Sequence, residues 1–239
     1  MALTQPSIDL RPMNINEVFG PTIQGEGPHT GLQVAFVRTA GCNLSCVWCD
    51  TPYSWDWDRY DRSKESHKMT VAEIIEQVKT MGVDRIVLTG GEPMLQQAQI
   101  PALAEAGFKI DIETNGTRTP TLDTIAATDL FCVSPKLAHA GDPEKLRVRL
   151  DTLKVFSELA DAGKALFKFV AQQDSDLDEI AEFCKAANIA DRHIWVMPEG
   201  ADADTHLTNL RNLADKVIER GWNLTSRLHV MIWNTERAH

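Results

Sequence analysis

The segment Val34–Thr51 reads VAFVRTAGCNLSCVWCDT, an apolar and β-branched run followed by three cysteines within eight residues. The run predicts a buried strand. Cys42, Cys46 and Cys49 then follow with the spacing C-x3-C-x2-C on the loop after that strand. In parallel α/β folds, sites are built at this carboxyl edge of the sheet. Three thiolates on one loop can hold three irons of a [4Fe–4S] cube, leaving the fourth iron open to a small chelating molecule.

The number and positions of the cysteines leave one alternative to a cluster on this loop, which is a zinc site. The chain has five cysteines, and an odd number with three on one loop does not suit a disulfide framework. A zinc site is the alternative, but structural zinc needs four ligands, and His29, His67, Cys132 and Cys184 stand at no recognisable spacing for the fourth. We expect Cys132 and Cys184 to be buried in the core, because free cysteine packs as a small apolar residue.

Strand-like and helix-like segments alternate along the rest of the 239 residues. Strands separated by helices indicate βαβ units and therefore a parallel sheet. About seven strands are too few for a closed eight-stranded barrel, so an α/β partial barrel in a single domain, residues 1–239, is predicted. The expected strands are Val34–Thr39, Asp84–Thr89, Phe108–Glu113, Leu130–Val133, Ala165–Val170, His193–Met197 and Arg227–Trp233. One helix is expected to begin at Thr70, with a capping box to Glu73. The other expected helices are Gln97–Ala106 (with a break or late start near Pro101), Leu122–Ala127, Asp151–Ala162, Leu177–Ala187 and Asp204–Arg220.

Charge and hydropathy limit the class of protein. The chain carries 24 Lys and Arg against 34 Asp and Glu, for a net charge of −10. A field of that sign repels phosphate backbones and argues against a general nucleic-acid binder, but not against one anionic small molecule in a local basic pocket. No apolar run approaches the roughly 18 residues of a membrane helix. Residues 1–12 contain no apolar core of a signal peptide, which predicts a cytoplasmic protein without membrane partners.

Two further motifs lie at predicted strand ends. Thr89–Pro93 reads TGGEP and Glu113–Gly116 reads ETNG. Together with the cysteine loop, in this order, they resemble the radical SAM superfamily. The resemblance implies a partial (β/α)6-type radical SAM barrel with parallel strands, a [4Fe–4S] cluster and S-adenosylmethionine. In that superfamily the GGEP backbone and its glutamate contact the methionine amine of S-adenosylmethionine, which implies this role for Gly91 and Glu92. Polar residues at the end of the next strand also contact S-adenosylmethionine, which implies this role for Glu113 and Asn115.

Smaller motifs narrow the resemblance. Gln24–Gly27 reads QGEG, Arg38 stands four residues before Cys42, and Asp50-Thr51 follows Cys49 directly. With SPK at 134–136, this combination resembles the 7-carboxy-7-deazaguanine synthase family from about Asn14 to Trp233. The resemblance implies ring contraction of 6-carboxy-5,6,7,8-tetrahydropterin to 7-carboxy-7-deazaguanine with loss of ammonia. The radical that starts the reaction would come from S-adenosylmethionine cleaved at the reduced cluster, with Mg²⁺ assisting.

The residues that the resemblance places around each group are as follows. The cysteines Cys42, Cys46 and Cys49 would bind the cluster, and Thr51 would be a hard oxygen ligand of Mg²⁺. The substrate would contact Ile23, Gln24, Gly25, Glu26, Arg38 and Thr89. S-adenosylmethionine would contact Gly91, Glu92, Glu113, Asn115, Ser134, Pro135, Lys136 and the segment Met197, Pro198, Glu199 and Gly200. Chemistry supports part of this set, because a pterin carboxylate suits the guanidinium fork of Arg38, and a pyrimidine edge suits Glu26 and Gln24.

Some features leave alternatives open. A radical SAM activase that makes a glycyl radical on a partner protein would share the cysteines and GGEP, but not QGEG or CDT. A zinc-binding interaction module is the non-enzymatic alternative. The resemblance also implies a homodimer and a flavodoxin-like reductant. Some family members end soon after the last strand and place the terminal carboxylate near the substrate, whereas here the polar residues 234–239 follow, and the long segment Leu137–Leu150 has no assigned role.

Overall fold

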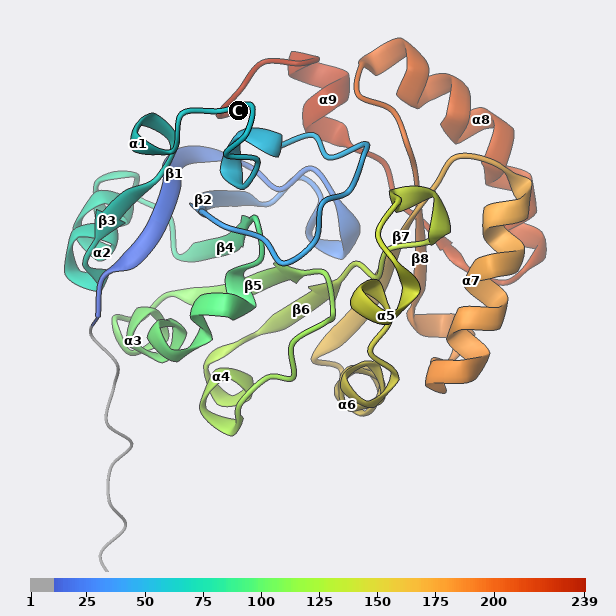
Figure 1. Ribbon diagram of the computed structural model, residues 1–239, viewed down its shortest axis with the longest axis horizontal. Helices are drawn as coiled ribbons and strands as arrows, with labels where there is room; N and C mark the ends of the chain where they lie inside the picture. The colour runs from blue at the N-terminus through green and yellow to red at the C-terminus, as the bar shows by residue number, and fades with distance from the viewer. Residues whose placement is uncertain (1–10) are drawn as a thin grey trace, which may run out of the picture.

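The structure is a computed structural model that describes residues 11–239. The prediction that residues 1–12 contain no signal peptide falls mostly outside the described residues. Those described residues form one curved sheet of nine strands in the order β3-β1-β2-β4-β5-β6-β7-β8-β9 (Figure 1). From β2 onward every neighbouring pair is parallel. The parallel strands are β2 (Gln33–Thr39), β4 (Arg85–Gly90), β5 (Lys109–Thr114), β6 (Leu130–Val133), β7 (Ala165–Ala171), β8 (Ile194–Pro198) and β9 (Asn223–Leu224). The predicted α/β partial barrel is therefore confirmed.

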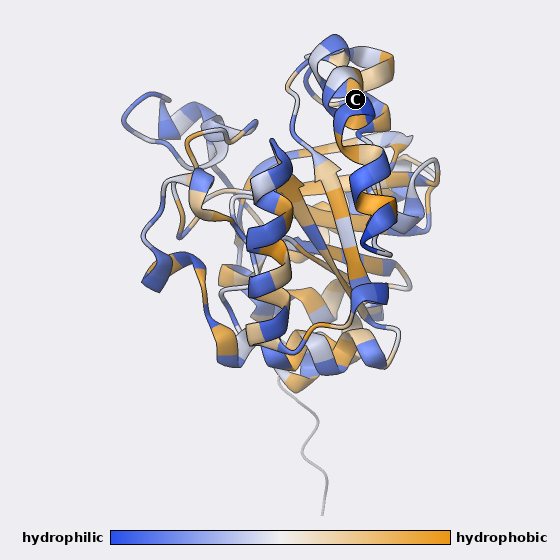
Figure 2. Cartoon of the chain, turned by 90° about the vertical axis from the view of Figure 1, so that its right-hand side faces the viewer, coloured by the Kyte–Doolittle hydropathy of each residue, from blue (hydrophilic) through white to orange (hydrophobic). Residues whose placement is uncertain are grey.

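Helices cover the outer face of this sheet because each has one apolar stripe (Figures 1 and 2). In α2 (Val71–Thr80), for example, Val71, Ile74 and Val78 recur at helical spacing and are buried. The capping box predicted for this helix is present, with Thr70 and Glu73 bonded to each other's backbone N–H. The other helices of the cover are α3 (Ile100–Glu105), α4 (Leu122–Ala127), α6 (Leu150–Asp161), α7 (Asp174–Ala187) and α8 (Ala203–Glu219).

Pro101 explains a late helix start. The segment predicted as one helix from Gln97 to Ala106 is divided into η3 (Pro93–Gln99) and α3, with Pro101 in the first turn of α3. Proline is tolerated there because the first N–H groups of a helix have no intrahelical acceptor. The remaining short helices are η1 (Gly27–His29), η2 (Pro52–Ser54), α1 (Arg62–Glu65), η4 (Ala138–Ala140), α5 (Glu144–Arg147), η5 (Asp191–His193) and α9 (Leu228–Trp233).

Two antiparallel strands extend the sheet beyond the predicted ones. β1 (Met13–Ile23) pairs with β2, and β3 (His67–Met69) pairs with the start of β1. Met13 and Ile15 on β1 are buried, while the strand is mostly half-exposed toward its end. Because buried and exposed positions do not alternate clearly along β1, its sequence does not indicate a strand. Its pairing depends on the neighbouring parallel sheet.

The prediction of a last strand over Arg227–Trp233 is wrong. These residues form α9, and the seventh parallel strand is the two-residue β9 before them. A six-residue apolar run does not distinguish a strand from a short helix. In α9, Val230 faces inward, whereas Met231 and Ile232 are exposed. No helix of residues 11–239 combines the length and apolarity needed to cross a membrane.

Candidate functional site

A pocket opens at the carboxyl edge of the parallel strands, where the sequence motifs meet. Its lining takes residues from the ends of β2, β4, β5, β6 and β8, from the cysteine loop, and from the chain around α9. The lining carries four cationic side chains (Arg38, Lys136, Lys168 and Arg227) against three carboxylates (Glu26, Asp50 and Glu113). A chain of net charge −10 therefore has a locally cationic pocket. This charge suits an anionic small molecule.

The three cysteines of the C-x3-C-x2-C loop all line this pocket. Leu44 N–H donates to Cys42 Sγ at 3.4 Å, and Trp55 Nε1–H donates to Cys49 Sγ at 3.3 Å. Cys132 and Cys184 are buried, as predicted. Burial raises the pKa of Cys42 to about 12 and that of Cys46 to about 11. Both thiols are therefore protonated at neutral pH, and binding iron would release their protons.

The loop fits a cluster better than a single metal ion. Within residues 11–239, no three His, Cys, Asp or Glu side chains lie close enough together to hold one metal ion. A cube binds each thiolate to a different iron, so its ligands need not converge on one point. N–H donors to the sulfurs, as at Cys42 and Cys49, are typical of cluster sites, where they tune the reduction potential. The residues present therefore fit a [4Fe–4S] cluster with three protein ligands.

Asp142 secures the middle of the cysteine loop. Its carboxylate accepts Ser45 N–H at 3.1 and 3.0 Å and the Ser45 hydroxyl at 2.9 Å, and it lies 3.8 Å from Cys46 Sγ. Val47 N–H donates to the carbonyl of Ala140, 3.0 Å away. The segment 137–150, which had no assigned role in the sequence, thus packs directly against the cysteine loop.

The glycines of TGGEP are required by backbone packing. A Cβ on Gly91 would lie 2.0 Å from the carbonyl oxygen of Gly41, and one on Gly90 would lie 2.3 Å from that of Thr39. Gly90 also has a φ of +120°, which L side chains rarely adopt. The TGGEP turn is therefore pressed against the start of the cysteine loop, in addition to facing the pocket.

Glu92 lies beneath the pocket rather than on its lining. Its side chain is buried, and it accepts three hydrogen bonds, from Met94 N–H at 3.0 Å, the Thr114 hydroxyl at 2.8 Å and Asn115 N–H at 2.7 Å. Burial raises its pKa, partly offset by these donors. Glu92 therefore joins the end of β4 to the end of β5, and it stands behind Gly91 and Asn115, which do line the pocket.

The residues predicted to contact the substrate form a second wall of the pocket. Ile23, Gln24, Glu26, Arg38 and Thr89 line the pocket. Gly25 lies just outside it, pressed against His229, since a Cβ there would be 1.9 Å from His229 Nδ1. Arg38 Nε donates to Glu17 at 2.7 Å.

Glu113 joins this wall through two hydrogen bonds. Its carboxylate accepts the Thr89 hydroxyl at 2.8 Å and Gln24 Nε2–H at 3.2 Å. Gln24 Oε1 in turn accepts the backbone N–H of Glu26 at 3.1 Å. The amide of Gln24 therefore links the carboxylate of Glu113 to the backbone of Glu26.

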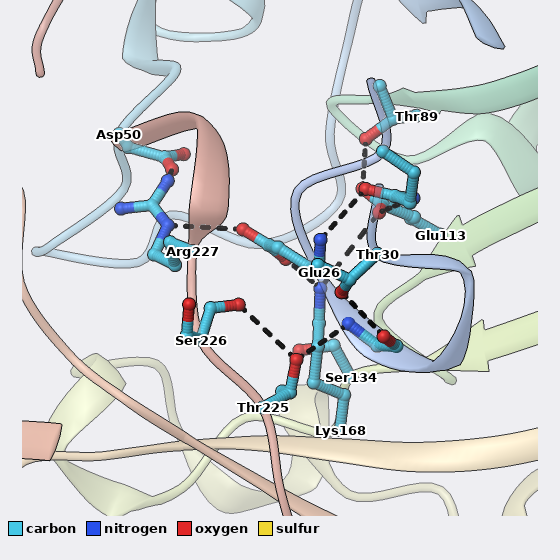
Figure 3. A network of polar contacts seen from close by, with 12 residues as sticks. Glu26, Thr30, Asp50, Thr89, Glu113, Ser134, Lys168, Thr225, Ser226 and Arg227 are labelled. Carbon is cyan, nitrogen blue, oxygen red and sulfur yellow. Dashed lines mark hydrogen bonds and ion pairs between the residues drawn. The ribbon is translucent and has the colours of Figure 1, made fainter. Parts of the chain in front are cut away.

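A buried ionic network runs through this wall (Figure 3). Glu26 accepts from Lys168 Nζ through one oxygen and from Arg227 Nε, 3.1 Å away, through the other. Arg227 also donates to Asp50, the neighbour of Cys49, and to the carbonyl of Gly200. Burial alone would raise the pKa of Glu26, but Lys168 and Arg227 outweigh it and hold the pKa well below its usual range. Glu26 is therefore an ionised carboxylate inside the pocket.

The other residues predicted to meet S-adenosylmethionine are divided between lining and support. Ser134, Lys136 and Met197 line the pocket, and Lys136 Nζ donates to Ser134 Oγ at 3.0 Å. Pro135, Pro198, Glu199 and Gly200 are not among the lining residues. Thr51 lines the pocket with its hydroxyl oxygen 3.8 Å from Cys49 Sγ.

His206 on α8 braces the loop after β8. It is fully buried, its Nδ1 lies 3.1 Å from the carbonyl of Pro198, and its Nε2 accepts the backbone N–H of Arg227 at 3.0 Å. The two contacts require a neutral ring with the proton on Nδ1. Burial lowers the pKa of His206, in keeping with this neutral form.

The C-terminal residues fold back across the pocket. His239 is among the lining residues. Arg237 lies over the Tyr53 ring, 3.8 Å from its centroid, and donates to Glu17 at 3.0 Å and to Glu65 at 2.8 Å. Of the aromatic side chains in the segment 52–68, Trp55 lines the pocket. The tail that distinguishes this sequence thus runs along the β1 side of the site.

Sequence reasoning missed Lys168, Arg227, Asp142 and His206. Lys168 left a signal, because a lysine inside the otherwise apolar run ALFKFVA needs a buried partner. Arg227 had been placed at the start of a strand. Asp142 binds Ser45, 97 residues away, and His206 binds backbone groups 8 and 21 residues away, so no local pattern marks either residue.

Comparison with known proteins agrees with this geometry. The radical SAM superfamily model matches residues 36–149. The chain is similar to the 7-carboxy-7-deazaguanine synthases of Pyrobaculum aerophilum (32% identical, covering 95% of this chain and 97% of the relative) and Halobacterium salinarum (36%, covering 92% and 90%). It is also similar to the crystal structure of QueE from Escherichia coli, with 25% identity, a TM-score of 0.66, and 91% and 95% of the two chains covered.

Proposed function

The chain belongs to the 7-carboxy-7-deazaguanine synthase family of the radical SAM superfamily, and from this premise we propose that it converts 6-carboxy-5,6,7,8-tetrahydropterin to 7-carboxy-7-deazaguanine with loss of ammonia. Such a reaction belongs to the biosynthesis of 7-deazapurines of the queuosine type. The observation that carries the proposal is one pocket that joins three loop cysteines to a cationic wall. A glycyl-radical activase acts on a partner protein and would not need the cationic wall of this pocket.

The cofactors would be held on the β4–β6 side of the pocket. Cys42, Cys46 and Cys49 would bind the [4Fe–4S] cluster. S-adenosylmethionine would lie along Gly91, Glu113, Asn115, Ser134–Lys136 and Met197, with Glu92 and Pro198–Gly200 supporting the two ends from behind. When bound, the cluster and S-adenosylmethionine supply the radical chemistry that removes a hydrogen atom from the substrate.

The chain's own side chains would hold the pterin beside the cluster and S-adenosylmethionine. Arg38 would bind the pterin carboxylate, since its guanidinium group has N–H donors in addition to the Nε–H that donates to Glu17. Glu26 and Gln24 would read the donors and acceptors of the pyrimidine edge, beside Ile23, Gly25 and Thr89. The hydroxyl of Thr51, next to the cluster ligand Cys49, is the proposed protein ligand of Mg²⁺, which usually keeps water and substrate oxygens as its other ligands.

Three further parts of the proposal concern the reductant, the oligomeric state and the location. The reductant is proposed to be a flavodoxin-like protein, the working form a homodimer of single-domain chains, and the location the cytoplasm. Size-exclusion chromatography with light scattering tests the oligomeric state, and reduction by purified flavodoxin in place of dithionite tests the electron donor.

The deciding experiment is an anaerobic assay. The reconstituted protein is incubated with the pterin, S-adenosylmethionine and dithionite, with and without Mg²⁺, and the products are identified by mass spectrometry. Formation of 7-carboxy-7-deazaguanine, faster with Mg²⁺, is the expected result. Cleavage of S-adenosylmethionine without a deazapurine would refute the substrate and favour the activase. A colourless, zinc-loaded protein without labile sulfide would refute the enzyme altogether.

A further inference from the structure

We propose that Lys168 is a positioning residue of the substrate site, which fixes the Glu26 carboxylate in the orientation that reads the pyrimidine edge of the pterin. This inference rests on the proposed function and adds to it a residue that no motif marks. Lys168 stands at the centre of β7, the strand opposite the loop that carries Glu26.

The surroundings of Lys168 make it a paired, buried charge. Every residue of β7 is buried, and the Lys168 side chain is only 5% exposed. A lysine in such a place is costly unless a carboxylate faces it. Nζ meets Glu26 directly and lies 4.0 Å from the Glu113 carboxylate. The amine therefore stands between two of the pocket's three carboxylates.

Glu26 is held from two sides but not saturated. Lys168 occupies one of its oxygens and Arg227 the other. Each carboxylate oxygen can accept a second hydrogen bond, and Glu26 lines the pocket. A pterin presents a ring N–H and an exocyclic amine side by side, and a carboxylate of fixed plane can accept from both at once. The two cations thus set the plane of Glu26 and leave its remaining lone pairs for the ligand.

Lys168 also separates like charges. Gln24 links the backbone of Glu26 to the carboxylate of Glu113, so both acids are tied to the same short loop. Without the amine, two neighbouring carboxylates would repel, and one would rotate away or take up a proton. Either change would remove the acceptor geometry that the pyrimidine edge needs. S-adenosylmethionine binding should be weakened less than pterin binding, because of its proposed contacts Glu113 lies 4.0 Å from Lys168, whereas the pterin would lose the acceptor that Lys168 holds directly, Glu26.

A double-mutant cycle tests the proposal on the cluster-loaded enzyme. Lys168→Met, Glu26→Gln and the double variant are compared for pterin KM, kcat and S-adenosylmethionine Kd. Lys168→Met is expected to raise the pterin KM about 10- to 100-fold, the loss typical of a charged hydrogen bond. S-adenosylmethionine Kd should rise by less than the pterin KM. If Lys168 acts through Glu26, the double variant binds no worse than Glu26→Gln alone.

The controls separate this role from a general loss of structure. Lys109 on β5 makes an exposed pair with Asp84 at 3.1 Å, so Lys109→Met should leave KM unchanged. Lys168→Arg, which keeps the charge, should recover part of the affinity lost in Lys168→Met. If the methionine variant does not fold, Lys168→Gln enters the cycle in its place.

The outcomes are distinguishable from a failure of the proposed function. If the wild-type enzyme does not convert the pterin, the proposed function is refuted first. If wild type converts it, independent losses that multiply in the double variant would overturn the role of Lys168. An equal weakening of pterin and S-adenosylmethionine binding in Lys168→Met would overturn it as well.

Discussion

Replacing Asp142 by alanine should loosen the cysteine loop while all three proposed cluster ligands stay in place. The carboxylate is the acceptor for both the N–H and the hydroxyl of Ser45. A hydrogen bond to a charged acceptor contributes about 1.5–3 kcal/mol. Ser45 is exposed, so water replaces part of what is lost. We therefore take about 1.5–3 kcal/mol for the two bonds together, instead of twice that value.

Hydrogen exchange measures this change directly. Local opening at Ser45 should become easier by that free energy, which corresponds to exchange about 10- to 150-fold faster in Asp142→Ala. Val47, bonded to the same segment, should follow in the same direction. Mass spectrometry on peptides that cover residues 44–48, in protein before iron loading, reports both amides. The same variant should retain less iron after reconstitution.

A matched variant supplies the control. Asp202 accepts the N–H of Thr205 at 2.9 Å and its hydroxyl at 2.7 Å, the same pair of bonds at the start of α8. Asp202→Ala should leave exchange in the cysteine loop unchanged. Exchange at Ser45 within twofold of wild type in Asp142→Ala, or an equal acceleration in both variants, would refute the proposed hold of Asp142 on the loop.

Three other predictions concern the buried histidine, the cysteines and the tail. His206→Leu should lower the free energy of unfolding by about 2–4 kcal/mol, more than His206→Gln, because it leaves a carbonyl and an N–H unpaired. Since the folded pKa of His206 lies below its ordinary 6.5, its stability advantage over the Gln variant should be full above pH 6.5 and fall as the pH drops below that value, in urea titrations. Cys46→Ser should lose the cluster, measured as iron and labile sulfide, whereas Cys184→Ser should keep it despite lower stability. Arg237→Ala should speed amide exchange in residues 234–239 severalfold with Tm within about 2 °C of wild type, because exposed ion pairs contribute little.

The parts of the fold that sequence could predict are those decided locally. The parallel strands from β2 to β8 are apolar runs bounded by turn residues, and the helix at Thr70 has a cap as well as a period. The cysteine spacing is a local property of one loop, and it identified the centre of the site. Strand β1 was missed because its half-exposed pattern has no clear period.

The parts that sequence could not predict depend on distant partners. The run 228–233 becomes α9 where the N–H of Leu228 donates to the carbonyl of Gly25, 2.8 Å away. The pairing of Lys168 with Glu26 spans 142 residues, and no local rule names its partner. The resemblance implies that Gly91 meets a ligand, whereas the obstacle nearest to a Cβ at this position is the carbonyl oxygen of Gly41, 2.0 Å away.

These separations in sequence bear on how the enzyme is made. The cysteine loop finds Asn115 and Asp142 within the first 150 residues, so a nascent chain can anchor this loop before synthesis ends. The wall around Glu26 waits for Arg227, 201 residues later, and for Thr225, which binds Gly27 N–H at 2.7 Å. Contacts of such range form late in folding. A truncated or stalled chain would thus present the cysteine loop before Glu26 has gained its partners Lys168 and Arg227.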